Sequence, residues 1–504
     1  MPSFILSGDL VVTGVDEPVI TDGAVLVDGE RVVAIGSVAQ MRSRNPGAEE
    51  RGGPGHVVIP GLIDAHQHGR GVTNIQRGVP DGFLEQWLIR LRGLWPMDPY
   101  LTTLVAALRL IRSGVTTAMH HFASTGVVPF EEEIDATLRA YRDAGMRVTF
   151  TLDFRDRNYY VYAPDSEFLS SLPSALAGAV SKQLPPRVLP KPSEVMALLS
   201  KVRRSWGSPK LRLALGPQGG EWSSDESLKD VAAFARAESL PIHTHMLESR
   251  LQRHASLREH GISAVERFAR LGLLGANTSL AHMVWVTDLD LDIVRDAGAA
   301  IVHNPASNLR LRSGIAPVLR MLRRGIPVAI GMDGMSLSDQ GDYFQDLRLC
   351  RSLHFDDQGA LDSPDVWRMV YEGGGRATFW GDSIGRLRPG CWADAVVMRL
   401  PVDVAVAPLD PVWRVQDRVL REGGPSAIRT VVVGGRVVID NGIAQTVDEP
   451  AILDAVRSYA GSADAASVTT RRHLVKQLEA AVADYYRSWN VGDDARALNA
   501  IHHR

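Results

Sequence analysis

The chain has 504 residues, of which 45% are hydrophobic and 22% are charged, as in ordinary soluble globular proteins. Its net charge of −3 excludes a global basic field that would recruit nucleic acid. The two cysteines, Cys350 and Cys391, exclude a disulfide framework and a cysteine-based zinc finger. The length suits a barrel of roughly 250–400 residues with an accessory domain.

The N-terminal segment has neither a basic stretch nor an apolar run of signal-peptide length. No window approaches the roughly 18 uncharged apolar residues that a transmembrane helix requires. We therefore expect a cytoplasmic enzyme that acts on a small-molecule substrate, with no membrane or nucleic-acid partner.

Short strands are predicted at both ends of the chain. In the first 59 residues, apolar or alternating runs lie between Gly and Asp turns, at Phe4–Val12, Ala24–Val27 and Arg31–Ile35. The same pattern returns at Ala395–Arg399, Thr430–Val433 and Arg436–Asp440, with a Gly-Gly hairpin turn. The matching pattern predicts one small sheet built from both ends of the chain, residues 1–59 and 395–447.

Between these ends, strand-like runs alternate with helix-like stretches such as Tyr100–Ser113 and Glu131–Ala144. Eight such apolar runs occur, at Val57–Ile59, Thr116–Met119, Val148–Leu152, Leu211–Leu215, Ile242–Thr244, Ser279–Ala281, Ala300–Val302 and Val328–Ile330. Eight strands alternating with helices predict an α/β fold, a (β/α)8 TIM barrel over residues 60–394.

Two segments fall outside this alternation. Phe154–Pro192 is rich in tyrosine and proline, and fits either an active-site lid or a surface excursion with a small core of its own. Residues 448–504 look helical and amphipathic. We expect them to form a C-terminal helical extension that packs on the barrel or on a second subunit, and we assign no chemistry to it.

His66 and His68 directly follow an apolar segment and are the strongest candidates for a functional site. A strand places residues i and i+2 on the same face, so both imidazoles can point at one metal ion. The carboxyl ends of barrel strands are where TIM-barrel active sites lie. An isolated His-x-His pair can also be two ordinary polar residues at the surface, but the preceding buried strand favours metal ligands.

Further candidates also end predicted barrel strands. Glu248 follows one of these strands closely, which suits metal-assisted hydrolysis, where one group holds the ion and another moves protons. For each candidate the alternative is an ordinary core or surface residue. His354 is not a candidate, because its polar sequence context predicts that it is solvated. Imidazoles and carboxylates without a thiolate suit Zn²⁺, Fe²⁺, Mn²⁺ or Co²⁺ with one position open for water. These candidates are His243, His245, His282 and Asp333.

Seven motifs then occur in order within residues 57–336, namely PGLIDAHQH, LEQWL, SGVTTAMHH, HTHMLES, LAHMVWVTD, VHNPASNLRLRSGIAPV and GMDG. With them the sequence resembles the amidohydrolase superfamily. The match is closest to its chlorohydrolase/aminohydrolase branch, which holds s-triazine hydrolases, guanine- and cytosine-type deaminases and phenylurea-type hydrolases. The resemblance covers nearly the whole chain except the tail. It implies that the sheet formed by residues 1–59 and 395–447 is a composite β-sandwich, and that the protein is a homo-oligomer of two or more subunits.

The resemblance also implies roles for individual residues. Glu248 would shuttle a proton from the attacking water to the leaving nitrogen, and His282 would orient or polarise the hydroxide. Asp333 would act both as a ligand and as a base. No lysine stands in the strand-4 segment LRLALGPQGG, which implies a single divalent metal ion, with Zn²⁺ favoured over Fe²⁺, Mn²⁺ or Co²⁺. Its ligands would be His66, His68, His245 and Asp333.

Branch members place substrate contacts at the LEQWL motif, although Trp87 is equally compatible with the core face of an amphipathic helix. The strand-4 segment ends in Pro217-Gln218 instead of the usual Pro-His, which argues against adenosine-type and S-adenosylhomocysteine-type deamination. We expect Ser307 and Asn308 to shape their loop through side-chain to backbone bonds. The candidate substrate contacts are Glu85, Trp87, His121, Gln218, His303 and Asn304.

We therefore expect a metal-dependent hydrolase that cleaves a non-peptide C–N bond of a small planar molecule by attack of a metal-bound hydroxide. The bond would belong to an amidine, urea, carbamate or amide. The alternative within this chemistry is a heteroaromatic deaminase or dechlorinase of the s-triazine or nucleobase type. A non-catalytic metal-binding barrel is the third reading, disfavoured because all the expected ligands are present.

Overall fold

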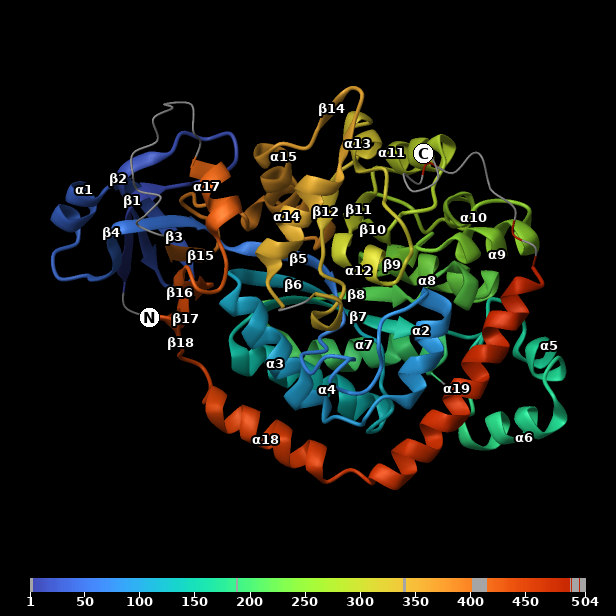
Figure 1. Ribbon diagram of the computed structural model, residues 1–504. Coiled ribbons are helices and arrows are strands. Elements are labelled where there is room, and N and C mark those ends of the chain that lie inside the picture. The colour runs from blue at the N-terminus through green and yellow to red at the C-terminus, as the bar shows by residue number, and fades with distance from the viewer. Residues whose placement is uncertain are drawn as a thin grey trace.

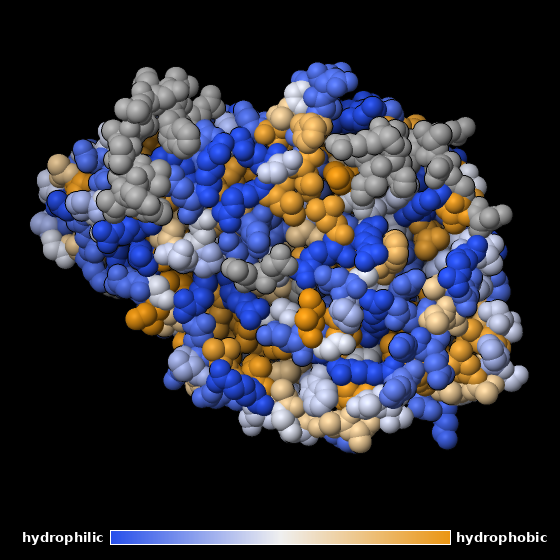
Figure 2. All heavy atoms as spheres, in the orientation of Figure 1, coloured by the Kyte–Doolittle hydropathy of each residue, from blue (hydrophilic) through white to orange (hydrophobic). Residues whose placement is uncertain are grey.

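The computed structural model describes residues 3–186, 189–338, 341–400 and 415–489, together with Val491 and Leu498. Two eight-stranded sheets dominate it, one at the left and one in the middle of the view in Figure 1. Hydrophilic residues cover much of the face in Figure 2, and apolar residues form small patches between them. In the described part of the chain, no helix combines the length and the apolar character needed to cross a membrane.

The central sheet is a ring of parallel strands in the order β12-β11-β10-β9-β8-β7-β6-β5. A parallel bridge between Gln67 and Asp333 brings its last strand against its first. Helices such as α3 (Pro99–Arg112) and α4 (Phe130–Ala144) surround the ring (Figure 1), which confirms the predicted TIM barrel. The strands are β5 (Leu62–Gln67), β6 (Val115–His121), β7 (Arg147–Phe154), β8 (Leu211–Pro217), β9 (Ile242–Met246), β10 (Thr278–His282), β11 (Ala300–His303) and β12 (Val328–Ile330).

The first barrel strand differs from the prediction. Val57–Ile59 was expected to open the barrel, but it belongs to β4 (Glu49–Pro60) of the other sheet. Gly61 separates β4 from β5, and a Cβ there would lie 2.2 Å from the Thr116 hydroxyl, so the chain passes tightly from one sheet to the next. Two apolar strands joined by one residue look like a single run, because burial on both faces removes any alternation.

The second sheet combines both ends of the chain in the order β18-β17-β16-β15-β4-β1-β2-β3, as the composite sandwich prediction required. The buried Arg147 at the start of β7 pairs with Asp394 next to β15, which ties this sheet to the barrel. The strands are β1 (Phe4–Val11), β2 (Ile20–Asp28), β3 (Arg31–Ser37), β15 (Ala395–Arg399), β16 (Ile428–Val433), β17 (Arg436–Asp440) and β18 (Ile443–Ala444).

A second small core lies outside the barrel, between the segment after β7 and the C-terminal extension. The segment after β7 contains α5 (Asp165–Ser170) and α6 (Ser174–Gln183), and the C-terminal extension contains α18 (Glu449–Gly461) and α19 (Ala465–Arg487). Figure 1 shows α19 running beside α2 (Leu84–Arg90) and close to α5 and α6. The shared core consists of Tyr160, Val161, Tyr162, Phe168, Val180, Leu474, Val475, Leu478, Val482 and Tyr486, among others.

Candidate metal centre

Polar side chains from four strands meet at the carboxyl end of the barrel. His66 lies in β5 and His68 just after it, His245 lies in β9, and His282 ends β10. Asp333 follows β12, and the closure of the ring fixes its place. The His68 N–H donates to the Asp333 carbonyl at 2.8 Å, and the Asp333 N–H donates to the His66 carbonyl at 2.7 Å. The first and last strands therefore present their side chains together.

The potential ligand atoms of these residues converge. The Asp333 Oδ1 lies 3.4 Å from the His66 Nε2 and 3.2 Å from the His68 Nε2. The His245 Nε2 lies 3.3 Å from the His68 Nε2. Within the described chain, the buried Nε2 atoms of His66 and His282 have no hydrogen-bond partner. Unpartnered imidazole nitrogens gathered around a carboxylate fit a divalent metal ion.

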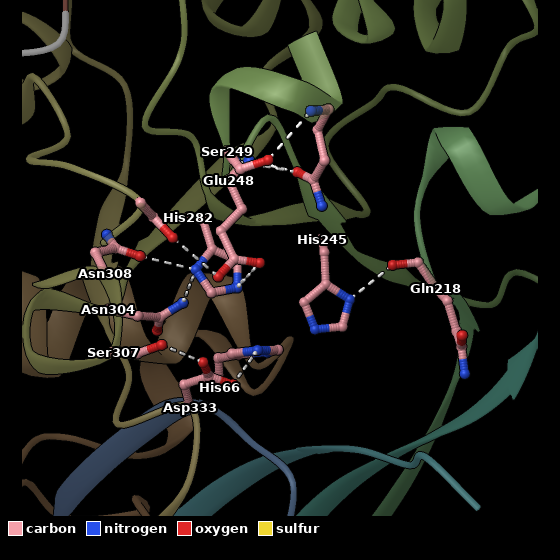
Figure 3. A network of polar contacts seen from close by, with 12 residues as sticks. His66, Gln218, His245, Glu248, Ser249, His282, Asn304, Ser307, Asn308 and Asp333 are labelled. Carbon is pink, nitrogen blue, oxygen red and sulfur yellow. Dashed lines mark hydrogen bonds and ion pairs between the residues drawn. The ribbon is translucent and has the colours of Figure 1, made fainter. Parts of the chain in front are cut away.

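Two of the rings have a defined orientation. The Nδ1 of His68 lies 2.7 Å from the His121 carbonyl oxygen, and the Nδ1 of His245 lies 2.7 Å from the Gln218 carbonyl oxygen (Figure 3). A carbonyl oxygen only accepts hydrogen bonds, so in both rings Nδ1 carries the proton. The lone pair of each neutral ring then stays on Nε2, on the side of the Asp333 carboxylate, as a metal ligand requires.

His243 lies behind this centre. Its Nε2 is 2.7 Å from the His66 Nδ1, and its own Nδ1 is 2.6 Å from the Ser279 hydroxyl. The sequence predicted that His243 and His245 share one strand face, but the two side chains have different contacts in the structure. His245 faces the centre directly, whereas His243 orients His66 through a hydrogen bond.

The prediction that Ser307 and Asn308 shape their loop through backbone bonds is corrected by their contacts. Ser307 donates from its hydroxyl to the Asp333 carboxylate, and the Asn308 Oδ1 lies 2.9 Å from the His282 Nδ1 (Figure 3). The Asn304 amide nitrogen lies 3.3 Å from the same His282 atom. These side chains hold residues of other strands, a role that only the folded barrel reveals.

Burial sets the protonation states of the centre. Desolvation lowers the pKa of His66 and His245 well below the ordinary histidine value, and it also lowers the pKa of His282. Burial opposes ionisation of Asp333, but the close imidazoles of His66 and His68 hold its pKa well below its usual range. Neutral imidazoles beside an ionised carboxylate are the forms that bind a metal ion.

Glu248 follows β9 at the edge of the centre. One carboxyl oxygen lies 3.6 Å from the His282 Nε2, and the other accepts a hydrogen bond from the Ser313 hydroxyl at 3.4 Å. Burial, followed by the negative charges of Asp333 and Glu85, raises the pKa of Glu248 well above its ordinary value. A buried carboxyl that takes up protons readily is suited to proton transfer beside the centre.

Comparison with known families settles the classification. The model of the amidohydrolase family matches residues 57–438, which is more than half of the chain. The chain belongs to the amidohydrolase family. It is a hydrolase of carbon–nitrogen bonds other than peptide bonds. A second model, an imidazolonepropionase-like composite domain of bacteria, matches residues 23–48 in the second sheet.

Curated relatives of this amidohydrolase include two deaminases. A 5'-deoxyadenosine deaminase of Methanothermobacter thermautotrophicus is 27% identical over 467 residues, which cover 90% of this chain and 98% of the relative. A 5-methylthioadenosine/S-adenosylhomocysteine deaminase of Nitratidesulfovibrio vulgaris is 28% identical over 447 residues, which cover 87% and 92%.

Solved structures share the fold of this amidohydrolase. An atrazine chlorohydrolase from Arthrobacter aurescens TC1, complexed with zinc, has a TM-score of 0.73 at 24% identity and covers 91% of this chain and all of its own. An adenosine deaminase from Xanthomonas campestris with bound zinc has a TM-score of 0.74 at 22% identity, and covers 91% of this chain and 98% of its own.

A cavity of about 630 Å³ lies against the metal centre of this amidohydrolase. Four predicted substrate contacts line it: Glu85, Trp87, His121 and Gln218. Trp87 also packs in a small apolar cluster with Leu84, so its position is compatible with both the substrate contact and the core face. The cavity is also lined by residues of the centre, namely His68, His245, Glu248, His282 and Asp333.

His303 and Asn304, the other two predicted substrate contacts, do not line this cavity. His303 is buried, and its Nε2 lies 2.9 Å from the Nε2 of His354. Asn304 is buried against His282. His354 is only 5% exposed, so the prediction that it is solvated is wrong. It ends α14 (Tyr343–Leu353), and its polar sequence context gave no sign that the chain turns it inwards.

The outer wall of the cavity comes from segments outside the barrel. Tyr160 and Tyr162 belong to the segment after β7, which therefore both covers the cavity and has its own core. Tyr486 belongs to α19. The aromatic content of the first segment suggested a lid, whereas the amphipathic tail gave no sign of a position at the site.

Proposed function

We propose that this amidohydrolase removes an amino group by hydrolysis from an amidine-type carbon of a planar nitrogen heterocycle, with one divalent ion and Zn²⁺ as the favoured metal. The ligands would be His66, His68, His245 and Asp333. The names of the curated relatives and the zinc in the neighbouring structures support this proposal. Open-chain amides, ureas and carbamates are the competing substrates.

The observation that carries the proposal is the group formed by Glu248, His282 and Asp333. Their ligand atoms lie within 4.8 Å of one another, and all three residues line the cavity. In the proposed complex, two carboxylates and an imidazole would surround one reacting carbon.

In the proposed reaction the bound ion would supply Lewis-acid activation of water. Asp333 would take a proton from the attacking water, and Glu248 would pass a proton to the leaving nitrogen. The His282 Nε2 would orient the attacking water, while Asn308 holds the other side of the ring. Water adds to the carbon, the C–N bond breaks, and the nitrogen leaves as ammonia or an amine.

Gln218 gives one constraint on the substrate ring. Its side-chain amide donates to the Asp153 carboxylate at 2.7 Å. The side-chain carbonyl of Gln218 is then left to accept a hydrogen bond from the substrate, such as one from a ring N–H. This difference from the usual Pro-His motif favours a heterocycle other than a purine nucleoside.

A substrate screen tests the proposal. The purified, zinc-loaded protein would be given guanine, cytosine, melamine and 5'-deoxyadenosine, and in parallel benzamide, phenylurea and ethyl carbamate. Ammonia or amine release would be read by mass spectrometry. We expect turnover of at least one heteroaromatic amine and none of the open-chain compounds. The reverse pattern would establish the competing chemistry, and no turnover with substoichiometric metal would favour the non-catalytic barrel.

We also infer a cytoplasmic homo-oligomer of two or more subunits, from the resemblance of the sequence to its branch. Light scattering coupled to size-exclusion chromatography would measure the mass of the assembly in solution. A mass equal to one chain of 54.9 kDa would reject the oligomer.

A further inference from the structure

The C-terminal helix α19 contributes a residue to the cavity of the metal centre, although it lies far along the chain from the barrel. Tyr486, near the end of this helix, is 8% exposed and lines the cavity together with Glu85 and Tyr162. Its ring centroid lies 5.8 Å from that of Tyr162, and the Tyr162 ring lies 5.6 Å from that of Trp222. Three aromatic rings from three segments therefore stand together at the outer cavity.

Hydrogen bonds connect Tyr486 to the neighbourhood of the centre. The Tyr162 N–H donates to the Tyr486 hydroxyl oxygen at 2.8 Å, and the Tyr162 hydroxyl donates to a Glu85 carboxyl oxygen at 3.3 Å. The same Glu85 oxygen accepts a hydrogen bond from Ser249, the residue that follows Glu248. This series of bonds reaches from α19 to the residue adjoining the proposed proton donor.

The helix is held firmly along its length. Glu479 pairs with Arg90 of α2 at 2.6 Å, and Arg472 donates to the carbonyls of Gly93 at 3.0 Å and Arg77 at 2.6 Å. Its apolar face is buried in the small core shared with the segment after β7. These contacts fix the place of Tyr486 relative to the cavity.

We propose that Tyr486 is a positioning and specificity-determining residue of this amidohydrolase. Its hydroxyl holds the backbone of Tyr162, and through Tyr162 it positions Glu85. Its ring limits the size of the substrate group that points away from the metal centre. This inference rests on the proposed function, since it assumes that substrates enter this cavity.

Paired substitutions at neighbouring tyrosines test it in the full-length, zinc-loaded protein. Tyr486→Trp enlarges the ring at the cavity wall, and Tyr486→Phe removes only the hydroxyl. Tyr485→Trp and Tyr485→Phe are the matched controls, because the Tyr485 hydroxyl bonds Glu167 at 2.7 Å and Tyr485 does not line the cavity. The probes are acetohydroxamate and 4-phenylbenzohydroxamate, which share a metal-binding group and differ in bulk.

We expect Tyr486→Trp to raise the Kd of 4-phenylbenzohydroxamate about tenfold, because overpacking opposes the larger probe. The Kd of acetohydroxamate should stay within twofold, and both control variants should bind like the wild type. Calorimetric titration would give these constants. Equal affinities for the bulky probe in wild type and Tyr486→Trp would overturn the specificity role.

The positioning role has a separate readout. In Tyr486→Phe the Tyr162 N–H loses its acceptor, and we expect its amide hydrogen to exchange about tenfold faster. Tyr485→Phe should leave this exchange unchanged, and an unchanged rate in Tyr486→Phe would overturn positioning. If neither hydroxamate binds the wild type, the proposed metal function fails, while the exchange measurement still decides the hydrogen-bond role of Tyr486.

Discussion

Two groups of histidines lie at or near the ends of barrel strands, and they differ in orientation. In the first group, His66, His68 and His245 turn their Nε2 atoms towards the Asp333 side of the cavity, while partners outside the group hold their Nδ1 atoms. The second group is His303 with His354 and Cys350, whose ligand atoms also lie within 4.8 Å of one another. There the two Nε2 atoms face each other at 2.9 Å.

The difference shows that closeness and burial do not by themselves make a metal centre. In the second group the two imidazoles contact each other through their Nε2 atoms, and burial raises the pKa of the Cys350 thiol, which keeps it protonated. None of the three residues lines the cavity. The first group combines imidazole nitrogens without hydrogen-bond partners, a carboxylate and access for a substrate. Together these features favour metal binding and hydrolysis.

Removing a member of the first group should have the largest effect. We expect His245→Ala to lower the zinc content from about one ion per chain to near zero, and turnover to background, because the donor set is incomplete. Elemental analysis and ammonia release measure the two quantities. His354→Ala is the matched control from the second group and should keep its zinc; loss of zinc in both variants would contradict the comparison.

The proton-transfer role is the next effect in size. Glu248→Gln keeps the shape of the side chain but removes its acid, so we expect turnover to fall by about 10²–10⁴-fold. The zinc content should stay at the wild-type value, because Glu248 is outside the proposed ligand set. Turnover within a few fold of wild type would remove Glu248 from the mechanism.

Loss of the residue that orients His282, beside the first group, should lower activity less. Asn308→Ala takes away the partner of the His282 Nδ1, and we expect activity to fall about 10–100-fold. Asn277→Ala is the control, since its side chain bonds the Leu240 carbonyl at 3.1 Å, before β9 begins. Equal losses in both variants would show a general effect on stability instead of orientation.

His354 of the second group should make the free energy of unfolding depend on pH. Burial lowers the pKa of His354 to about 4, whereas an unfolded histidine titrates near 6.5. Below about pH 6.5 the unfolded chain takes up a proton that the folded chain refuses, so His354 destabilises the fold as pH falls towards 4. We expect this loss, about 3 kcal/mol, to be absent in His354→Gln. Urea unfolding at pH 7 and pH 4 would measure it, and parallel curves for both proteins would contradict it.

The sequence supported much of the fold and the centre, because both depend on local periodicity. Strand alternation placed His66 and His68 on one face, and the ends of later strands supplied His245, His282 and Asp333. The prediction did not divide the first apolar run at Gly61, because the end of β4 and all of β5 are buried and the pattern does not change between them. Such a boundary depends on which neighbours each strand pairs with.

Contacts made across the fold lay beyond sequence reasoning. Asn308 and Ser307 bond residues that follow or end other strands, and His354 meets His303 only because the fold brings the end of α14 to the end of β11. The amphipathic pattern of α19 predicted that one face would be buried, but not which surface it would cover. These contacts depend on tertiary packing, which leaves no periodic pattern in the sequence.

The bridge between Gln67 and Asp333 has a consequence for folding. It joins the first strand of the ring to the last, so the centre is complete only after nearly the whole barrel sequence has been assembled. Contacts between distant parts of a chain form late and slowly. An ion held by His66, His68 and Asp333 would bind only the closed ring and stabilise it by mass action. In this way metal loading would report that the barrel has closed.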